Sequence, residues 1–244
     1  MKYLITFSYD GSKYYGYQKQ PSKKTIQKEI EDVLFQLNSN KEVIISASGR
    51  TDSGVHALNQ KAHFVLNNNF DPEKLKYTMN KMLSSSIYIK KIELVNDDFH
   101  ARFDVKRKKY TYKINIGEYN PLEYDYILQY NKPLNVEDMK KAIKFFEGKH
   151  NFKSFTKIDE EKESYEREIF ETSVNVKENI ISITFVGSGF MRYMVRNMVG
   201  LLVEIGSSKR NYDCVMDILK KEDRKESGIT IAANGLYLED VYYE

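Results

Sequence analysis

The sequence predicts an α+β fold built from two ferredoxin-like halves with mainly antiparallel sheets. The chain has 244 residues and is 41% hydrophobic, which is enough for a substantial core. Short segments that alternate apolar and polar residues indicate strands, and longer segments with apolar residues every three or four positions indicate helices. These segments follow the order β-α-β-β-α-β twice, which places two helices on one face of each sheet.

The first half begins with a strand over residues 2–9, followed by a turn at Asp10-Gly11-Ser12. Thr25 is the expected N-cap of a helix that ends near Asn38. Its apolar face consists of Ile26, Ile30, Val33, Leu34 and Leu37.

Two further strands are predicted over residues 43–48 and 61–66, with an irregular loop over 49–60 between them. Asp71-Pro72 then supplies an N-cap and a first helical residue. A strand over 87–95 closes this half.

The second half starts with a strand over 109–116 and a helix over 136–146, with Asn135 as its cap and Gly148 after its end. Strands over 168–176 and 180–186 form a hairpin.

The rest of this half is a helix over 191–205, an extra short helix over 212–220 and a last strand over 236–242. We place the domain boundary near 104–106, which gives an N-terminal domain of residues 1–105 and a C-terminal domain of residues 106–244. Residues 157–167 are almost all charged, and we expect an exposed, mobile loop there.

Composition narrows the class of protein. Cys214 is the one cysteine, so no disulfide forms within the chain, and no Cys/His cluster has zinc spacing. None of the four histidines is expected to bind a metal, although His56 can position its loop through a hydrogen bond. The sequence shows no signal-peptide stretch and no run long enough to span a bilayer, so a soluble cytoplasmic protein is expected.

The net charge of +3 does not by itself indicate a nucleic-acid partner. Nineteen tyrosines interleaved with lysines suit a surface that meets phosphates and bases, but codon bias in an A·T-rich genome explains the same composition.

The loop Gly49-Arg50-Thr51-Asp52-Ser53-Gly54-Val55-His56-Ala57 concentrates two glycines, an arginine and an aspartate after a predicted strand. Glycines permit unusual backbone angles, as a loop that presents one carboxylate to a large substrate needs. A tight loop with an internal ion pair between Arg50 and Asp52 is the structural alternative.

This loop resembles the Gly-Arg-Thr-Asp-x-Gly-Val-His-Ala motif of the tRNA pseudouridine synthase I (TruA) family. Further similar motifs follow the family's order along essentially the whole chain. They are Tyr9–Ser12 with Tyr15–Gln18, Asp98–Phe103, Lys108–Tyr112, Gly148–Phe155, Phe190–Gly200 and Gly235–Leu238.

The resemblance implies that Asp52 is the catalytic aspartate, that Tyr110 contacts the target base and that Arg196 pairs with Asp52. It implies a catalytic cleft between the two halves, and a reaction that needs no metal or other cofactor. Asp52 acts as nucleophile at C1′ or as general base at C2′, and the sequence leaves both open. Arg50 is a wedge beside the flipped base or a phosphate ligand.

The partner implied by the resemblance is tRNA, modified at uridines 38, 39 and 40 of the anticodon stem-loop by a homodimer. Next to Tyr110, the residues Lys106, Arg107, Lys108 and Lys109 are candidates for contacts with the RNA backbone. A solvated basic edge, a cross-strand aromatic at Tyr110 and a surface arginine at Arg196 are the structural alternatives.

The sequence departs from the family pattern at Ser53, at Tyr17 and in the absence of a proline after Leu83. Two alternative functions fit the sequence less well. A non-catalytic RNA-binding protein on the same scaffold would have lost Asp52, Tyr110 or Arg196, and a carbohydrate hydrolase usually needs a second carboxylate, which the Asp52 loop lacks.

Overall fold

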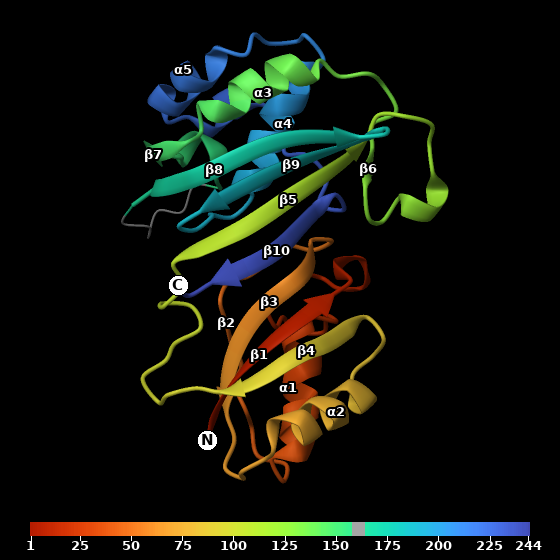
Figure 1. Ribbon diagram of the computed structural model, residues 1–244, viewed down its shortest axis with the longest axis vertical. Coiled ribbons are helices and arrows are strands. Elements are labelled where there is room, and N and C mark those ends of the chain that lie inside the picture. The colour runs from red at the N-terminus through yellow and green to blue at the C-terminus, as the bar shows by residue number, and fades with distance from the viewer. Residues whose placement is uncertain (158–163) are drawn as a thin grey trace. The chain divides into compact units, whose positions relative to one another are not determined.

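The computed structural model describes residues 1–157 and 164–244, and these form two compact units (Figure 1). The first unit comprises Met1–Lys106 and Tyr237–Glu244, and the second comprises Arg107–Leu236. Each unit has its own helices and its own mainly antiparallel strands, so the predicted α+β class is confirmed. No helix in the described residues is long and apolar enough to cross a membrane.

The sheet of the first unit is centred on β1 (Lys2–Tyr9), which lies between β3 (His56–Val65) and β4 (Ile87–Leu94) and is antiparallel to both. Side chains of a strand alternate between faces, and Tyr3, Ile5 and Phe7 are fully buried on one face. The predicted strand over 2–9 is therefore confirmed, and its apolar alternation reflects a real core face.

The two helices of this unit begin at the predicted caps. The Thr25 hydroxyl accepts the Lys28 N–H at the start of α1 (Ile26–Leu37), and Asp71 accepts the Lys74 N–H at the start of α2 (Pro72–Met82). Each cap satisfies a backbone donor that the first helical turn leaves without a partner.

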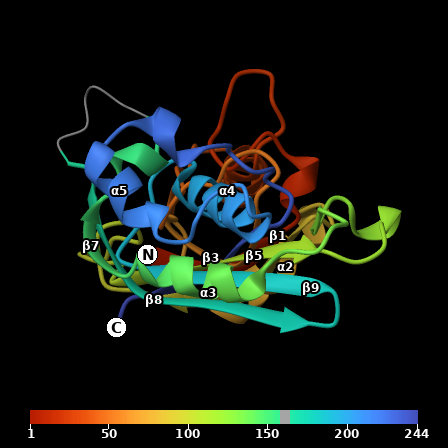
Figure 2. The same ribbon diagram turned by 90° about the horizontal axis from the view of Figure 1, so that it is seen from above.

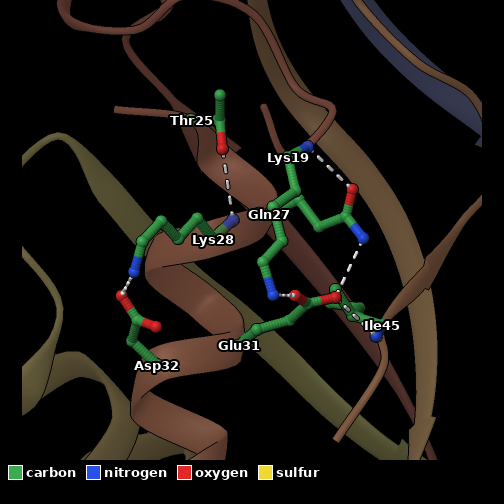
Figure 3. A network of polar contacts seen from close by, with 7 residues as sticks. All are labelled: Lys19, Thr25, Gln27, Lys28, Glu31, Asp32 and Ile45. Carbon is green, nitrogen blue, oxygen red and sulfur yellow. Dashed lines mark hydrogen bonds and ion pairs between the residues drawn. The ribbon is translucent and has the colours of Figure 1, made fainter. Parts of the chain in front are cut away.

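The predicted strand over 43–48 is wrong in its first half, because β2 contains only Ser46–Ala47. Val43 and Ile45 are buried and Ile44 is exposed, so the alternation is real, but the chain does not pair there as a strand. The Ile45 N–H instead donates to the side chain of Glu31 at 3.3 Å (Figure 3). A hydrogen bond that a helix side chain accepts thus takes the place of a strand-to-strand hydrogen bond.

Strand β3 begins at His56, five residues before the predicted strand over 61–66, and so takes in the end of the predicted loop. Its extra residues pair with segments remote in sequence: Ala57 lies opposite Tyr9, and His56 lies opposite Tyr237 of β10 (Leu236–Tyr242). The β10 pairing is parallel. Because β1 occupies one edge of β3, β10 and the short β2 share the other edge.

The second unit has β9 (Ile180–Gly187) between β5 (Arg107–Asn115) and β8 (Glu166–Lys177), antiparallel to both. Strand β7 (Gly148–Asn151) pairs antiparallel with β8, and β6 (Leu128–Gln129) pairs parallel with β5. The predicted hairpin between β8 and β9 is confirmed.

Helices α3 (Val136–Lys144) and α4 (Met194–Gly206) lie side by side in both views, with α5 (Cys214–Lys221) nearby (Figures 1 and 2). Helix α4 begins three residues later than predicted. Tyr193 adopts a left-handed conformation with φ of +64° immediately before it, which a right-handed helix cannot include.

Residues 158–163 of the predicted charged loop over 157–167 lie outside the described residues. At its far end the prediction is wrong, because Glu166 and Arg167 already belong to β8 and pair with β7.

Candidate functional site

The Asp52 loop is a tight turn that leads directly into β3. The Val55 N–H donates to the Asp52 carbonyl at 3.2 Å, and Gly54 between them has a φ of +82°. Glycine is the residue that adopts this conformation without strain. The turn keeps the Asp52 side chain half-buried while Thr51 and Val55 on either side are buried.

The N-terminal segment holds this turn by close backbone contact at two glycines. A Cβ atom added to Gly11 would lie 2.0 Å from the Val55 carbonyl oxygen. One added to Gly16 would lie 3.0 Å from the Thr51 oxygen, and Gly16 also has a φ of +91°. Only glycine lets the backbone approach the loop this closely. The two N-terminal motifs, Tyr9–Ser12 and Tyr15–Gln18, are thus physical supports of the Asp52 loop.

Hydrogen bonds fasten the same contact. The Tyr17 N–H donates to the Thr51 carbonyl at 3.1 Å, and the Ser53 hydroxyl donates to the Tyr14 carbonyl at 3.1 Å. Ser53, a departure from the family pattern, therefore adds a contact rather than removing one.

Tyr9 of β1 also contacts the Asp52 loop, through Thr51. Its hydroxyl forms a buried hydrogen bond of 2.8 Å with the Thr51 hydroxyl. Burial raises the pKa of Tyr9 to about 12, against the smaller opposing effect of the Thr51 and Gln60 hydrogen bonds. Tyr9 is neutral at physiological pH and its role is structural.

His56 ties the end of the loop to the turn after β1, as the sequence suggested. Its Nδ1 accepts the Gly11 N–H at 3.1 Å, and its ring stacks on Tyr237 with centroids 4.8 Å apart. Asp10 Oδ1 lies 3.4 Å from the same nitrogen. Because Nδ1 accepts the Gly11 N–H, it is not available as a donor to Asp10, and the hydrogen bond from Gly11 is the contact that holds the ring.

Arg50 is exposed and forms no ion pair with Asp52 within the described residues. The structural alternative for this loop, a turn closed by that ion pair, is therefore wrong. The glycine contacts hold the loop in its place.

In the second unit, Tyr110 lies on β5 opposite Phe185 of β9. Its side chain is 8% exposed, and its ring meets Phe190 edge to face at 5.1 Å. The cross-strand aromatic arrangement is thus present, and the ring is held by residues of the Phe190–Gly200 motif.

Tyr112 is two residues further along β5 and shares a face with Tyr110. Its hydroxyl donates to the Ala232 carbonyl at 2.7 Å. Burial raises the pKa of Tyr112 well above its usual value, and the positive charge of Arg196 opposes this rise. The Arg196 charge is therefore close to the strand face that carries both tyrosines.

Arg196 is half-buried on the first turn of α4 and is held on two sides. Its Nε donates to the Ile231 carbonyl at 2.8 Å, and its guanidinium carbon lies 5.3 Å from the centroid of the Tyr193 ring. Tyr193 is also the left-handed residue that precedes the helix. One residue, Tyr193, thus precedes the helix with its backbone and contacts the arginine with its ring.

Sequence reasoning missed the segment 227–235, which runs along α4 and supports Arg196. Thr230 donates to the side chain of the buried Asn197 at 2.6 Å. Gly200 permits the contact, since a Cβ there would lie 2.1 Å from the Ile229 carbonyl oxygen. A glycine inside a predicted helix was the one signal that could have revealed this close approach.

The residues of the basic run beside Tyr110 differ in exposure. Lys106 and Arg107 are exposed, whereas Lys108 and Lys109 are half-buried within β5. No group of three or more His, Cys, Asp or Glu side chains that could hold a metal ion occurs in residues 1–157 and 164–244.

The first unit thus presents one half-buried carboxylate on a clamped loop, and the second unit holds an anchored arginine and a buried tyrosine. A positioned carboxylate of this kind can act as nucleophile or general base, as in an enzyme that uses one acidic residue. Comparison with known proteins agrees with this class. A family model described as tRNA pseudouridine synthase matches residues 5–104 and 142–244.

Similar whole proteins carry the same description. The tRNA pseudouridine synthase A of Streptococcus agalactiae serotype Ia is 41% identical over all of this chain and 95% of its own length. That of Streptococcus pneumoniae strain 70585 is 41% identical, covering 100% of this chain and 99% of its own. That of Geobacillus sp. strain WCH70 is 38% identical, covering 98% and 97%. The chain belongs to the tRNA pseudouridine synthase family.

Proposed function

We propose that this protein isomerises uridine to pseudouridine in tRNA, at positions 38, 39 and 40 of the anticodon stem-loop. Family membership over the full chain supports the reaction, and the observation that carries the role of Asp52 is the glycine-buttressed loop that presents it. The isomerisation breaks the C1′–N1 bond and forms a C1′–C5 bond. The proton leaves C5 and a proton is gained at N1, so no redox partner is needed.

Asp52 is the catalytic residue in this proposal. As nucleophile it attacks C1′, and as general base it removes a proton from C2′. Both roles require an ionised carboxylate in a partly desolvated place, and the half-buried turn position of Asp52 supports either. The loop is held by backbone contacts, so the carboxylate keeps its position while a large RNA binds.

Arg196 is proposed to pair with the Asp52 carboxylate, and Tyr110 to contact the target base. A guanidinium stays protonated and offers a planar fork of donors, so one donor can bind the Ile231 carbonyl while others serve an anion. Tyr110 is packed against Phe190, and we propose that the part of its side chain that remains accessible contacts uracil. Unstacking the target base costs about a few kcal/mol. Arg50 is proposed either to insert beside the flipped base as a wedge or to bind a neighbouring phosphate.

The wider expectations belong to the same proposal. Each half follows the ferredoxin-like order, which the sequence of elements β1-α1-β2-β3-α2-β4 supports in the first. We propose functional domains of residues 1–105 and 106–244, with residues of both acting on one uridine, although Tyr237–Glu244 pack in the first compact unit. We further propose a homodimer, a cytoplasmic location where tRNA is found, RNA-backbone contacts from residues 106–109, and no cofactor.

The reaction is tested with unmodified tRNA transcripts that carry uridine at positions 38 to 40. Pseudouridine is mapped by chemical derivatisation and primer extension after incubation with wild type, Asp52→Ala and Asp32→Ala. Asp32 is an exposed acidic residue of α1 paired with Lys28, and serves as the matched control. We expect product from wild type and Asp32→Ala only.

If neither wild type nor Asp52→Ala forms pseudouridine while both bind tRNA equally, the chain is a non-catalytic RNA-binding protein. The two roles of Asp52 are separated with tRNA deuterated at C2′ of the target uridine. A primary isotope effect on a single turnover indicates the general base, and its absence indicates attack at C1′.

A further inference from the structure

A basic segment with an outward aromatic ring, residues 13–24, lies between β1 and α1. It contains four lysines and no acidic residue, and residues 18–24 are all exposed. We call it the basic–aromatic segment. Such a combination of lysines and an aromatic face suits a partner that carries both phosphates and bases.

The segment is folded into a defined shape. The Tyr15 N–H donates to the Lys24 carbonyl at 2.9 Å, and the Gln20 amide donates to the Tyr15 carbonyl at 3.0 Å. Lys19 connects the segment to α1: its ammonium lies 3.2 Å from the Glu31 carboxylate, and its backbone N–H donates to the Gln27 side-chain oxygen (Figure 3). Lys19 is therefore committed to structure, and a partner meets a surface that needs little ordering.

Its three tyrosines have different environments. Tyr14 and Tyr17 are 3% and 2% exposed, whereas Tyr15 is 55% exposed. Tyr14 binds Glu29 and Ser84 through its hydroxyl, and burial raises its pKa to about 12. Tyr14 and Tyr17 belong to the core, and Tyr15 alone presents its ring to a partner.

Lys23 accompanies the Tyr15 ring. Its ammonium lies 4.4 Å from the ring centroid and has no carboxylate partner among the described residues. Lys24 differs, because it lies 3.8 Å from Glu29. An ammonium without a counter-charge beside an exposed ring is an available site for a phosphate next to a base.

The position of Tyr15 connects this surface to the Asp52 loop. The Tyr14 carbonyl accepts the Ser53 hydroxyl, and Gly16 packs against the backbone of Thr51. Tyr15 lies between these two contacts. A ligand on Tyr15 and Lys23 is therefore held beside the loop that presents Asp52.

We propose that Tyr15 and Lys23 form a tRNA-binding point, at which an unpaired base stacks on Tyr15 while Lys23 moves from the ring to a neighbouring phosphate. The proposal rests on the tRNA substrate proposed above and names a contact for it outside the residues 106–109. An acidic protein would use the lysine but would not need the exposed ring.

Binding is measured by fluorescence anisotropy with labelled tRNA transcript over a range of salt concentrations. All variants carry Asp52→Ala, so that no product forms. We expect Tyr15→Ala to weaken the affinity about tenfold with an unchanged salt slope, because it loses stacking. Tyr15→Phe keeps the affinity. Lys23→Ala lowers the slope of log K against log salt by about 1, because it loses one phosphate contact.

The matched control is Tyr77→Ala. Tyr77 on α2 is 66% exposed and has the Lys81 ammonium 5.5 Å from its ring, so it repeats the pair away from the Asp52 loop. Lys28→Ala controls for charge. Equal loss in Tyr77→Ala and Tyr15→Ala overturns the proposal, as does an unchanged affinity in Tyr15→Ala or a change in oligomeric state alone.

The two proposals fail differently. If the Asp52→Ala parent does not bind tRNA, the proposed substrate is wrong. If the parent binds and Tyr15→Ala binds equally well, only the binding point is wrong. In the active background, Tyr15→Ala should raise KM about tenfold with kcat unchanged.

Discussion

The Asp52 loop and the start of α4 are fixed by opposite means. Asp52 lies on a segment whose own backbone is clamped, with Gly11 and Gly16 against Val55 and Thr51. Arg196 is instead held through its side chain, by the Ile231 carbonyl and the Tyr193 ring. Contacts to the backbone leave the loop little room to move, whereas contacts to a side chain still let a long charged group change its conformation. The backbone of Asp52 is thus fixed in place, whereas the side chain of Arg196 keeps some freedom to adjust.

The largest effect that this comparison predicts is from Gly11→Ala. The added Cβ, 2.0 Å from the Val55 oxygen, must displace the Asp52 loop. We expect the free energy of unfolding to fall by about 3 kcal/mol and activity to fall more than tenfold. Urea unfolding and the pseudouridine assay measure both.

Gly189→Ala is the control, because the nearest atom to its Cβ would be Arg167 Nε at 3.8 Å. Wild-type stability and activity in Gly11→Ala would show that the loop is not clamped.

The second prediction concerns Arg196→Lys. Lysine keeps the charge but cannot bind the Ile231 carbonyl and present a planar fork at the same time. We expect kcat to fall about 100-fold, as for loss of a positioned catalytic donor. The melting temperature should stay near that of wild type because the site is half-buried. Full activity in Arg196→Lys would show that only charge matters.

The third prediction separates ring from backbone at Tyr193. Both Tyr193→Ala and Tyr193→Gly remove the ring beside Arg196, and we expect both to lower kcat several-fold. Glycine tolerates the φ of +64°, so Tyr193→Gly should be more stable than Tyr193→Ala by about 1 kcal/mol. Equal stability of the two variants in urea would mean that the residue carries no backbone strain.

The smallest effect is expected at His63 of the first unit. Burial lowers the pKa of His63 below 6.5, helped by His100 and Lys2 and opposed by Asp104, and its Nδ1 accepts the Ala101 N–H at 3.1 Å. The unfolded chain binds the proton more readily, so this contribution is fully present above pH 6.5 and is lost as pH falls through the folded pKa.

Urea unfolding at pH 7.5 and pH 5 should therefore show a loss of stability that His63→Gln reduces. His150→Gln, a change in the second unit, should leave the pH dependence as in wild type. If the free energy of unfolding changes equally with pH in wild type and both variants, His63 is not the cause of the pH dependence.

Local patterns predicted much of the fold. The strands over 2–9 and 236–242 agree residue for residue with the structure, and Thr25, Asp71 and Asn135 cap the helices as expected. These features depend on neighbours in sequence, which is why they could be read.

The errors have a common physical cause. The 43–48 segment alternates in burial like a strand, but the Glu31 side chain accepts the Ile45 N–H in place of a neighbouring strand. Strand β3 starts at His56 because strands distant in sequence pair with it there. The left-handed Tyr193 has no local signal. For the candidate site, motif resemblance pointed to the Asp52 loop and its role stays a prediction, whereas neither the clamp by Gly11 nor the support along α4 is visible without coordinates.

The pairing of β10 with β3 sets the order in which parts of the protein can fold during synthesis. His56 at the end of the Asp52 loop stacks on Tyr237, which the ribosome adds on the order of ten to thirty seconds later at typical rates of synthesis. Until then the edge of β3 beside the loop lacks its last strand. The nascent chain can fold the first helices early, but the Asp52 loop acquires its contact with β10 only when synthesis has almost ended.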